Sequence, residues 1–266
     1  MKTILNRLDN WFFAHLSATP LLAAKAGLGG LIFISFAWNL GELQPIFIEG
    51  SPFRSYERGF FNPPQFWSYA AYYMVMVSSL LFAFLPRSRW PGPLLLVSHI
   101  YVVISYQILF VGWSQIVAWP IAFLSMVPID KAWGTVSAWP LRLLQLQVCG
   151  IYLCAAFGRL NNPLWMEGNL AFYFAKGGYS RIPGVDLSQV LSVLPLLTWS
   201  AWLAEFVLPV TIWIPQCRVA SAVLLILLHL SMELIGSLDW WPHFMIILLI
   251  CAFVLKHDVT PGRGTR

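Results

Sequence analysis

The sequence has few charged residues. Only 10% of its 266 residues are Asp, Glu, Lys or Arg, whereas a soluble domain carries about 25%. This shortage excludes an ordinary water-soluble domain and also a highly charged disordered chain. Hydrophobic residues make up 59% and aromatic residues 16% of the chain. The composition therefore predicts an all-α polytopic integral membrane protein.

Basic clusters and metal-binding motifs are also missing. The formal net charge is +5, but the Lys and Arg residues are scattered and form no run, so no nucleic-acid partner is expected. The cysteines form neither a CxxC pair nor a zinc-ligand spacing, which predicts small buried hydrophobic residues rather than a metal site. They lie in or beside apolar segments, at Cys149, Cys154, Cys217 and Cys251. No internal repeat is evident in the sequence either.

Apolar segments account for most of the chain. A transmembrane helix needs about 20 apolar residues, and several of these segments are shorter than that. Two of them are almost contiguous, so they form a tight helical hairpin or one of them is partly re-entrant. We therefore expect about eight transmembrane helices, with a range of six to eight. The segments are 21–40, 66–85, 93–110, 113–128, 139–160, 194–214, 218–237 and 241–255.

The N-terminal segment, 1–18, is not a clean apolar span. Its apolar residues recur at helical spacing, opposite Arg7 and Asp9. This pattern predicts an amphipathic helix that lies in the plane of the membrane interface. A cleaved signal peptide is the alternative, but polar residues interrupt the apolar core that such a peptide needs. We thus expect a single membrane domain, with the interfacial helix at 1–18, a bundle at 19–256 and a short tail at 257–266.

Basic residues indicate how the chain is oriented. With eight spans and an inside N-terminus, nine Lys and Arg residues fall on the inside and four on the outside. The inside residues are Lys2, Arg7, Arg87, Arg89, Lys131, Arg218, Lys256, Arg263 and Arg266, and the outside residues are Arg54, Arg58, Lys176 and Arg181. By the positive-inside rule we expect both termini in the cytoplasm, with the chain in a bacterial inner (plasma) membrane. Loops 41–65 and 161–193 then face outward.

Polar residues inside the apolar segments carry the functional signal, because each ionisable group at that depth costs about 2.5–3.5 kcal/mol. One helix face of segment 139–160 carries polar residues at spacings of three and four. A face of this kind does not meet lipid. Two interpretations remain open: hydrogen bonds between helices that fix the bundle, and a lining for a polar or anionic ligand. The residues of this face are Arg142, Gln145, Cys149, Tyr152, Ala156 and Arg159.

The next two apolar segments add ionisable residues. The first carries Glu205, and the second carries His229 and Glu233 one helical turn apart. An imidazole next to a carboxylate is typical of an oriented general base. A metal site is not favoured, because three candidate ligands from two segments are a weak signal. The other alternative is that Glu205 or Glu233 forms a buried structural ion pair with Arg142 or Arg159.

One segment resembles the signature of the HTTM family, the horizontally transferred transmembrane domain, which includes the vitamin K-dependent gamma-carboxylases and many bacterial relatives. The segment is 142–174, RLLQLQVCGIYLCAAFGRLNNPLWMEGNLAFYF. Its matching positions are Gln145, Gln147, Tyr152, Gly158, Arg159, Trp165, Gly168 and Tyr173. Two later helices add Trp199, Glu205, Pro209 and His229. The similarity extends from about residue 20 to residue 255 and implies an HTTM-like membrane domain.

The chain departs from the carboxylase pattern at several points. Where carboxylases have a Lys proposed as the catalytic base, this chain has Arg159, and an Arg stays protonated and cannot serve as a base. The stretch 110–114, which corresponds to their Asn-His pair, contains no His. Carboxylases also carry a large extramembrane domain, and the sequence ends at Arg266 without one. Gamma-glutamyl carboxylation is therefore not expected.

The resemblance and the polar residues together imply a membrane-embedded enzyme that acts on a lipid, quinone-like or peptide substrate with an anionic group. Its catalytic residues would be His229, Glu233 and Glu205. Its substrate-binding residues would be Arg142, Gln145, Tyr152, Arg159 and Trp165. No metal is predicted, and a quinone-like lipid is a candidate cofactor.

A non-catalytic role is the main alternative. The resemblance also fits a membrane partner in the maturation or export of a secreted or antimicrobial peptide, acting beside a partner membrane or redox protein. The polar face would then form a peptide groove or a subunit contact. A transporter is a weaker alternative, because the two halves of the sequence show no matched pair of broken helices.

Overall fold

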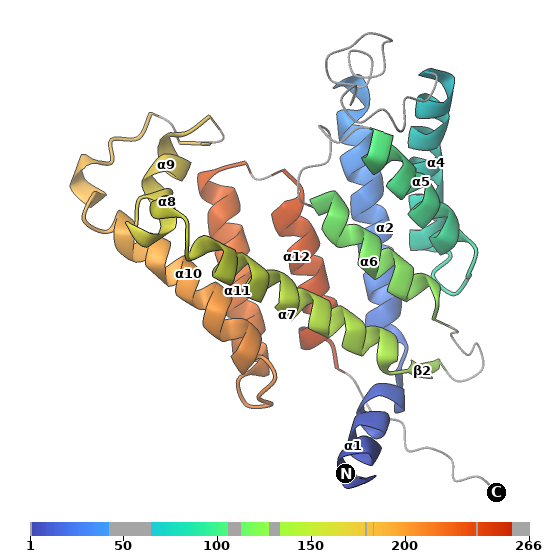
Figure 1. Ribbon diagram of the computed structural model, residues 1–266. Coiled ribbons are helices and arrows are strands. Elements are labelled where there is room, and N and C mark those ends of the chain that lie inside the picture. Colours follow the sequence, from blue (N-terminus) through green and yellow to red (C-terminus); the bar gives the residue numbers. More distant parts are fainter. Residues whose placement is uncertain are drawn as a thin grey trace, which may run out of the picture. The chain divides into compact units, whose positions relative to one another are not determined.

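The computed structural model confirms that the chain is mostly helical (Figure 1). It describes residues 2–42, 65–105, 113–127, 134–178, 180–182, 184–237 and 239–256. The chain divides into two compact units, with the boundary between Leu143 and Leu144. The predicted tail at 257–266 and most of the predicted loop at 41–65 lie outside the described residues.

The first unit is a helical bundle with a two-stranded ribbon. In the bundle α4 packs against both α2 and α5, and α5 packs against α6. A Cβ on Gly29 of α2 would lie 2.6 Å from the Ser79 carbonyl oxygen of α4, so glycine permits the close approach of these helices. The elements are α1 (Lys2–Phe13), β1 (His15–Ser17), α2 (Thr19–Trp38), η1 (Asn39–Glu42), α4 (Gln65–Phe84), α5 (Pro91–Ser105), α6 (Trp113–Ser125), β2 (Thr135–Ser137) and the start of α7 (Trp139–Arg159).

The predicted amphipathic helix at 1–18 is shorter in the structure. α1 ends at Phe13, and residues 15–17 form β1, which pairs antiparallel with β2. The expectation of helix up to residue 18 was therefore wrong for its last residues. A local sequence pattern cannot reveal a backbone pairing with a strand more than 100 residues away. Ile4 and Leu8 of α1 are exposed, as expected of an apolar face without a protein partner.

The second unit holds the remainder of α7 and the C-terminal helices. α10 packs against α9 and α11, and α11 packs against α12 and η5. The outward loop predicted at 161–193 contains two short helices, α8 and α9, which also contact α10. The elements after α7 are α8 (Pro163–Met166), α9 (Leu170–Lys176), η4 (Ser188–Val190), α10 (Leu194–Thr211), α11 (Arg218–Ile235), α12 (Trp241–Leu249) and the π-helical turn η5 (Ile250–Val254).

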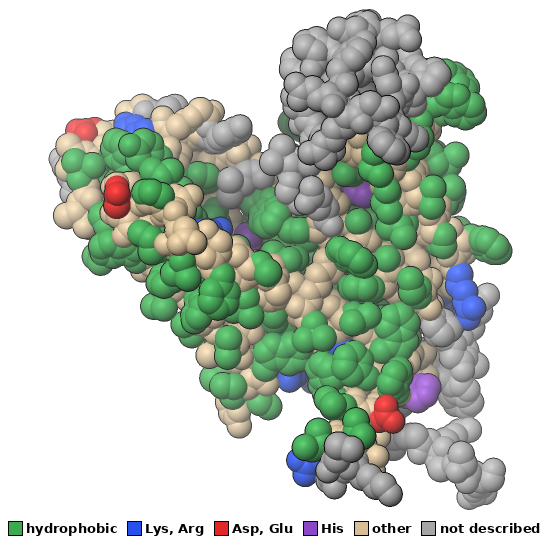
Figure 2. Space-filling model, in the orientation of Figure 1, with side chains coloured by type: hydrophobic (Ala, Val, Ile, Leu, Met, Phe, Trp, Pro, Cys, Tyr) green, Lys and Arg blue, Asp and Glu red, His purple; other side chains and the backbone are tan. Residues whose placement is uncertain are grey.

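Among the described residues, five helices are long and apolar enough to cross a membrane. Three shorter apolar helices coincide with the other three predicted segments: Pro91–Ser105, Ile116–Ser125 and Trp241–Val254. Hydrophobic side chains dominate the visible surface over these helices (Figure 2). The five long helices are Thr19–Gly41, Phe66–Phe84, Trp139–Arg159, Leu194–Thr211 and Arg218–Ile235.

Each strand of the ribbon leads into a helix with the same buried positions. The pattern Ser-Ala-x-Pro-Leu stands at 17–21 and again at 137–141. One and two turns later Ala24 and Leu28 are buried in α2, and Leu144 and Val148 are buried at the equivalent positions of α7. The sequence conceals this repeat because few residues are identical, whereas burial shows it.

The ribbon itself has local two-fold symmetry. The Ala18 N–H donates to the Gly134 carbonyl, and the Ala138 N–H donates to the Ala14 carbonyl, each at 2.8 Å. Ala18 and Ala138 are the equivalent donors of these two hydrogen bonds, and Gly134 and Ala14 are the equivalent acceptors.

A later part of the chain follows the same repeat. Buried residues of α4 and α5 have counterparts at identical spacing in α10 and α11: Ser68, Val75, Leu95 and His99 correspond to Thr198, Glu205, Leu225 and His229. We call residues 14–105 the first repeat and residues 134–235 the second repeat. The repeat was not evident in the sequence, and the buried positions reveal it.

Candidate functional site

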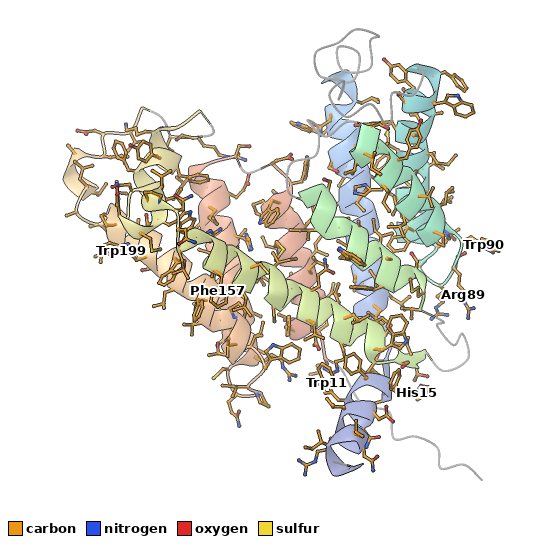
Figure 3. All side chains as sticks on the ribbon, in the orientation of Figure 1. Trp11, His15, Arg89, Trp90, Phe157 and Trp199 are labelled. Carbon is orange, nitrogen blue, oxygen red and sulfur yellow. The ribbon has the colours of Figure 1, made fainter. Side chains whose placement is uncertain are left out.

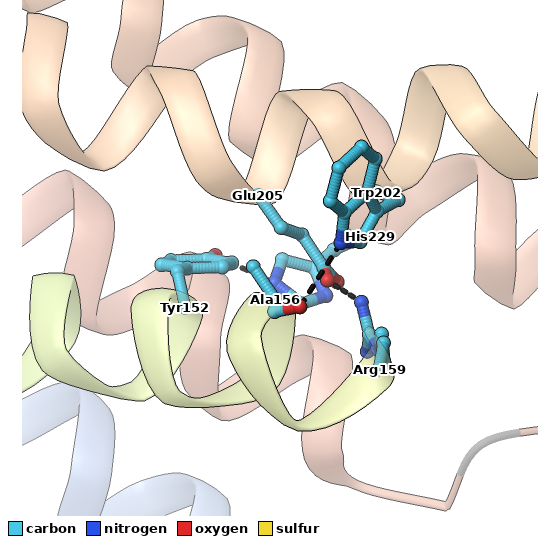
Figure 4. A network of polar contacts seen from close by, with 6 residues as sticks. All are labelled: Tyr152, Ala156, Arg159, Trp202, Glu205 and His229. Carbon is cyan, nitrogen blue, oxygen red and sulfur yellow. Dashed lines mark hydrogen bonds and ion pairs between the residues drawn. The ribbon is translucent and has the colours of Figure 1, made fainter. Parts of the chain in front are cut away.

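Four polar side chains from three helices meet in the second unit (Figure 4). Tyr152 and Arg159 come from α7, Glu205 from α10 and His229 from α11. Tyr152, Glu205 and His229 are each less than 5% exposed. We call these four residues the polar centre. In Figure 4, His229 lies between Tyr152 and the pair formed by Arg159 and Glu205.

His229 is held by Tyr152. The Tyr152 hydroxyl lies 2.6 Å from the His229 Nε2 atom. The Nδ1 atom of His229 is buried and has no hydrogen-bond partner among the described residues. A buried hydroxyl hydrogen without an acceptor is costly, and donation to Nε2 satisfies it. With Tyr152 as the donor, a neutral His229 carries its own proton on Nδ1, which is then a donor without an acceptor among the described residues.

Arg159 and Glu205 form an ion pair, with 22% and 5% of their side chains exposed. This is one of the pairs that the sequence left open as a structural alternative. The Arg159 guanidinium also lies over the Trp165 ring, 3.9 Å from its centroid, which adds a cation–π contact. One contact of the polypeptide backbone completes the surroundings: the Trp202 indole N–H donates to the Ala156 carbonyl at 3.0 Å.

A large pocket adjoins Arg159. It has a volume of about 1120 Å³ and is lined by side chains of α7 to α11, which exceeds the usual range of about 300–1,000 Å³ for small-molecule sites. Among the described residues, Arg159 is the one charged residue in its lining, and Thr198, Ser200 and Ser231 supply hydroxyl groups. The remaining lining residues are apolar or aromatic, including Trp165. The pocket therefore suits a molecule with a long apolar part and a polar group at Arg159.

The segment after α9 is fastened to the end of α11. Arg181 forms an ion pair with Glu233, and its N–H donates to the Ile235 carbonyl at 2.9 Å. Hydrogen bonds from the Ser188 backbone N–H and side chain hold the pKa of Asp186 below its ordinary value. These contacts order a segment whose Ile182 and Leu187 side chains line the pocket.

Thr198 and Gly168 position the short helices beside the pocket. The Thr198 hydroxyl donates to the Gly168 carbonyl and accepts from the Ala171 N–H, each at 3.0 Å. Gly168 has φ +76, and a Cβ there would lie 2.6 Å from the Pro195 side chain. Only glycine fits both constraints, which gives a structural reason for the Trp-x-x-Gly spacing from Trp165.

The structure brings together part of the predicted site. Tyr152, Arg159, Glu205 and His229 meet, and Trp165 lies against Arg159. The contact that orients His229 comes from Tyr152, which the sequence suggested as a substrate-binding residue. Trp202 and Arg181 were missed as partners; the position of Trp202 one turn before Glu205 was the available signal for the first.

Three other predicted residues make contacts elsewhere. The Arg142 Nε–H donates to the Trp11 carbonyl at 3.2 Å, and the guanidinium lies over the Trp11 ring, in the first unit. The Gln145 side-chain amide donates to the Ala252 carbonyl at 2.6 Å. Glu233 pairs with Arg181 at the end of α11.

No cluster of three or more His, Cys, Asp or Glu side chains suited to a metal ion occurs in the part of the chain that the structure describes. Comparisons with family models, curated proteins and solved structures gave no match. Membership of the HTTM family therefore stays a prediction from the sequence positions given above.

Proposed function

We propose that the protein is an HTTM-like, membrane-embedded enzyme that acts on an amphipathic substrate with an anionic group, of the lipid, quinone-like or peptide class. One observation carries this proposal: a buried polar centre adjoins a large apolar pocket among helices apolar enough to cross a membrane. The apolar part of the substrate would occupy the pocket, and its anionic group would bind Arg159. A bundle held together for stability alone does not require the pocket.

Each residue of the polar centre has a chemical role in this proposal. Arg159 keeps its charge and offers five N–H donors in a planar fork, so it holds the anionic group while Glu205 fixes its position. His229 is the residue able to give or take a proton, and Tyr152 sets its tautomer. Glu233 forms an ion pair with Arg181 and so helps to hold in place the segment after α9, whose Ile182 and Leu187 line the pocket.

We further propose that the eight apolar helices all cross the bacterial inner membrane, with both termini in the cytoplasm. In the first unit, Arg87 and Arg89 are exposed at the turn between α4 and α5 (Figure 3), and Lys25 near the start of α2 donates to the Pro86 carbonyl at 2.9 Å. α1, with its exposed Arg7, precedes this same end of α2. Basic residues thus gather at one end of that bundle, as the positive-inside rule expects of the cytoplasmic side.

A transporter remains less well supported. Transporters built from repeats place their substrate sites at the repeat interface. Here the polar centre lies within the second unit alone.

The experiment is a search for turnover in reconstituted membranes. Purified wild-type protein is placed in vesicles made from the total lipids and peptides of its host, and untargeted mass spectrometry follows every species over time. We expect at least one anionic amphipathic species to be consumed and a product to appear. Arg159→Gln and His229→Ala, at equal protein levels, should leave it unchanged, whereas Arg89→Gln, an exposed control, should act as wild type.

The proposal fails if no species changes, or if both variants of the polar centre keep full activity. A stably bound peptide or partner protein without turnover would instead support a non-catalytic role in peptide maturation or export.

A further inference from the structure

The two repeats share the same contact between their first two long helices. In the first repeat the Tyr72 hydroxyl of α4 donates to the Phe36 carbonyl of α2 at 2.6 Å. In the second repeat the Trp202 indole of α10 donates to the Ala156 carbonyl of α7 at 3.0 Å. Both donors and both acceptors stand at equivalent positions of the repeat. The repeats therefore offer a comparison of two centres built on one scaffold.

In the first repeat, the positions equivalent to the polar centre lie beside a packed cluster of rings. The Phe36 ring lies 4.6 Å from the Tyr72 ring and 6.1 Å from the His99 ring, measured between centroids. Phe36 and His99 are at most 1% exposed. The His99 Nε2 atom hydrogen-bonds to the Ser114 carbonyl at 3.0 Å. An aromatic ring thus covers the histidine of this repeat.

Only the histidine is common to the two centres. The positions that hold Tyr152, Arg159 and Glu205 in the second repeat hold apolar or uncharged residues in the first: Ile32, Asn39 and Val75. The packing of this fold therefore does not require the polar centre, because the first repeat packs without it.

At the position of Phe36 the second repeat has Ala156. Ala156 lies on α7 one turn after Tyr152 and about one turn before Arg159 (Figure 4). No ring covers His229 from this position, and its buried Nδ1 atom has no partner in the described chain. Arg159, one turn further along α7, borders the pocket. Ala156 thus places no ring against His229, and Arg159 is the residue of the polar centre that lines the pocket.

We propose that only the second repeat binds a ligand, that Ala156 is the residue that determines this, and that the ligand is an acyl-chain carboxylate. The chain would fill the pocket, and the carboxylate oxygens would accept from the His229 Nδ1–H and from Arg159. Because Arg159 and Glu205 neutralise each other, the ligand meets no excess of negative charge, and the remaining Arg159 donors serve a second carboxylate. This inference rests on the proposed site but requires binding only, not turnover.

The test measures binding of radiolabelled oleate to the full-length protein in nanodiscs of phosphatidylcholine, with oleyl alcohol as the uncharged probe. We expect one oleate per chain and binding of oleyl alcohol weaker by about tenfold or more. Ala156→Phe should abolish oleate binding, and Ala156→Val, a smaller change that the fold tolerates more easily, should weaken it. The matched variant Phe36→Ala should lower the melting temperature and leave the affinity for oleate unchanged.

Two oleates per chain, equal binding of the alcohol, or wild-type affinity in both Ala156 variants would overturn the inference. The enzymatic proposal is judged separately by turnover. If oleate binds as expected and no substrate is consumed, the proposal of an enzyme is rejected and the proposal of a carboxylate site stands. If a species is turned over but no oleate binds, the carboxylate site is rejected and the proposal of an enzyme stands.

Discussion

The Arg159–Glu205 pair is the residue contact whose role the sequence left open between structure and function. Two charges taken out of water are expensive, and their attraction does not always repay that cost. The pair is therefore a poor explanation of stability by itself. Removal of one partner leaves the other charge buried and uncompensated, which is costly whatever the pair does. Single variants thus cannot separate the two roles, whereas a double variant can.

We expect Glu205→Gln to lower the free energy of unfolding by about 3–5 kcal/mol, because it leaves Arg159 unpaired. The double variant Arg159→Met/Glu205→Leu should recover most of that loss, because apolar residues of similar size replace the pair. Thermal unfolding in detergent measures both. A double variant that remains as unstable as the single variant would show that the pair itself holds the bundle.

Tyr152 is expected to act through His229. Tyr152→Phe removes the hydroxyl that fixes the imidazole tautomer, and we expect the turnover rate to fall by about tenfold to a hundredfold. Stability should fall by only about 0.5–1.5 kcal/mol, as for one lost hydrogen bond. The matched control is Tyr72→Phe, which removes the equivalent hydroxyl of the first repeat. Equal activity losses in the two variants would argue against a specific role for Tyr152.

At the scale of elements, α7 shows why a helix face predicted only part of the site. Its periodicity correctly placed Arg142, Gln145, Tyr152 and Arg159 on one polar face. Periodicity does not show which neighbour each turn meets, and this helix has different neighbours along its length. Its first turns contact α1, its middle contacts η5, and its last turns contact α10 and α11. The face therefore divides into structural contacts at one end and the polar centre at the other.

α1 offers a test of the structural end of that face. Arg142 holds it through a hydrogen bond to the Trp11 carbonyl and a cation–π contact with the Trp11 ring. We expect Arg142→Ala to release α1, with faster hydrogen exchange over residues 2–13 and normal substrate turnover. Arg87→Ala, at an exposed position, is the control. If hydrogen exchange is unchanged and turnover is lost, Arg142 is better explained as a substrate-binding residue.

At the scale of the whole molecule, the hydropathy pattern predicted the helices but did not reveal the repeat. Long apolar segments identify helices because a backbone in lipid finds no water and must form its hydrogen bonds within the segment. The repeat escaped detection because, beyond the short Ser-Ala-x-Pro-Leu pattern and one histidine, the two copies share buried positions more than residues: Val75 and Glu205 occupy equivalent sites with opposite chemistry. Burial becomes visible only when the helices are packed. The polar centre is correspondingly a departure of the second repeat from the first.

The orientation of the chain can be tested with cysteine substitutions in a cysteine-free background. We expect Glu167→Cys to react with a membrane-impermeant maleimide in intact cells, because it lies in a segment that we propose faces outward. Arg89→Cys should react only after the cells are permeabilised. Labelling in the opposite order would invert the proposed topology, and labelling of both in intact cells would contradict the span count.

The central claim is that the polar centre and the adjoining pocket hold an amphipathic ligand. Its most direct test is native mass spectrometry of the purified protein beside the Arg159→Met/Glu205→Leu variant, which lacks both charges and is expected to keep the fold. We predict one anionic lipid-like molecule bound per wild-type chain after extensive washing, and none bound to the variant. The same bulk lipids in the same amounts on both proteins would contradict the account.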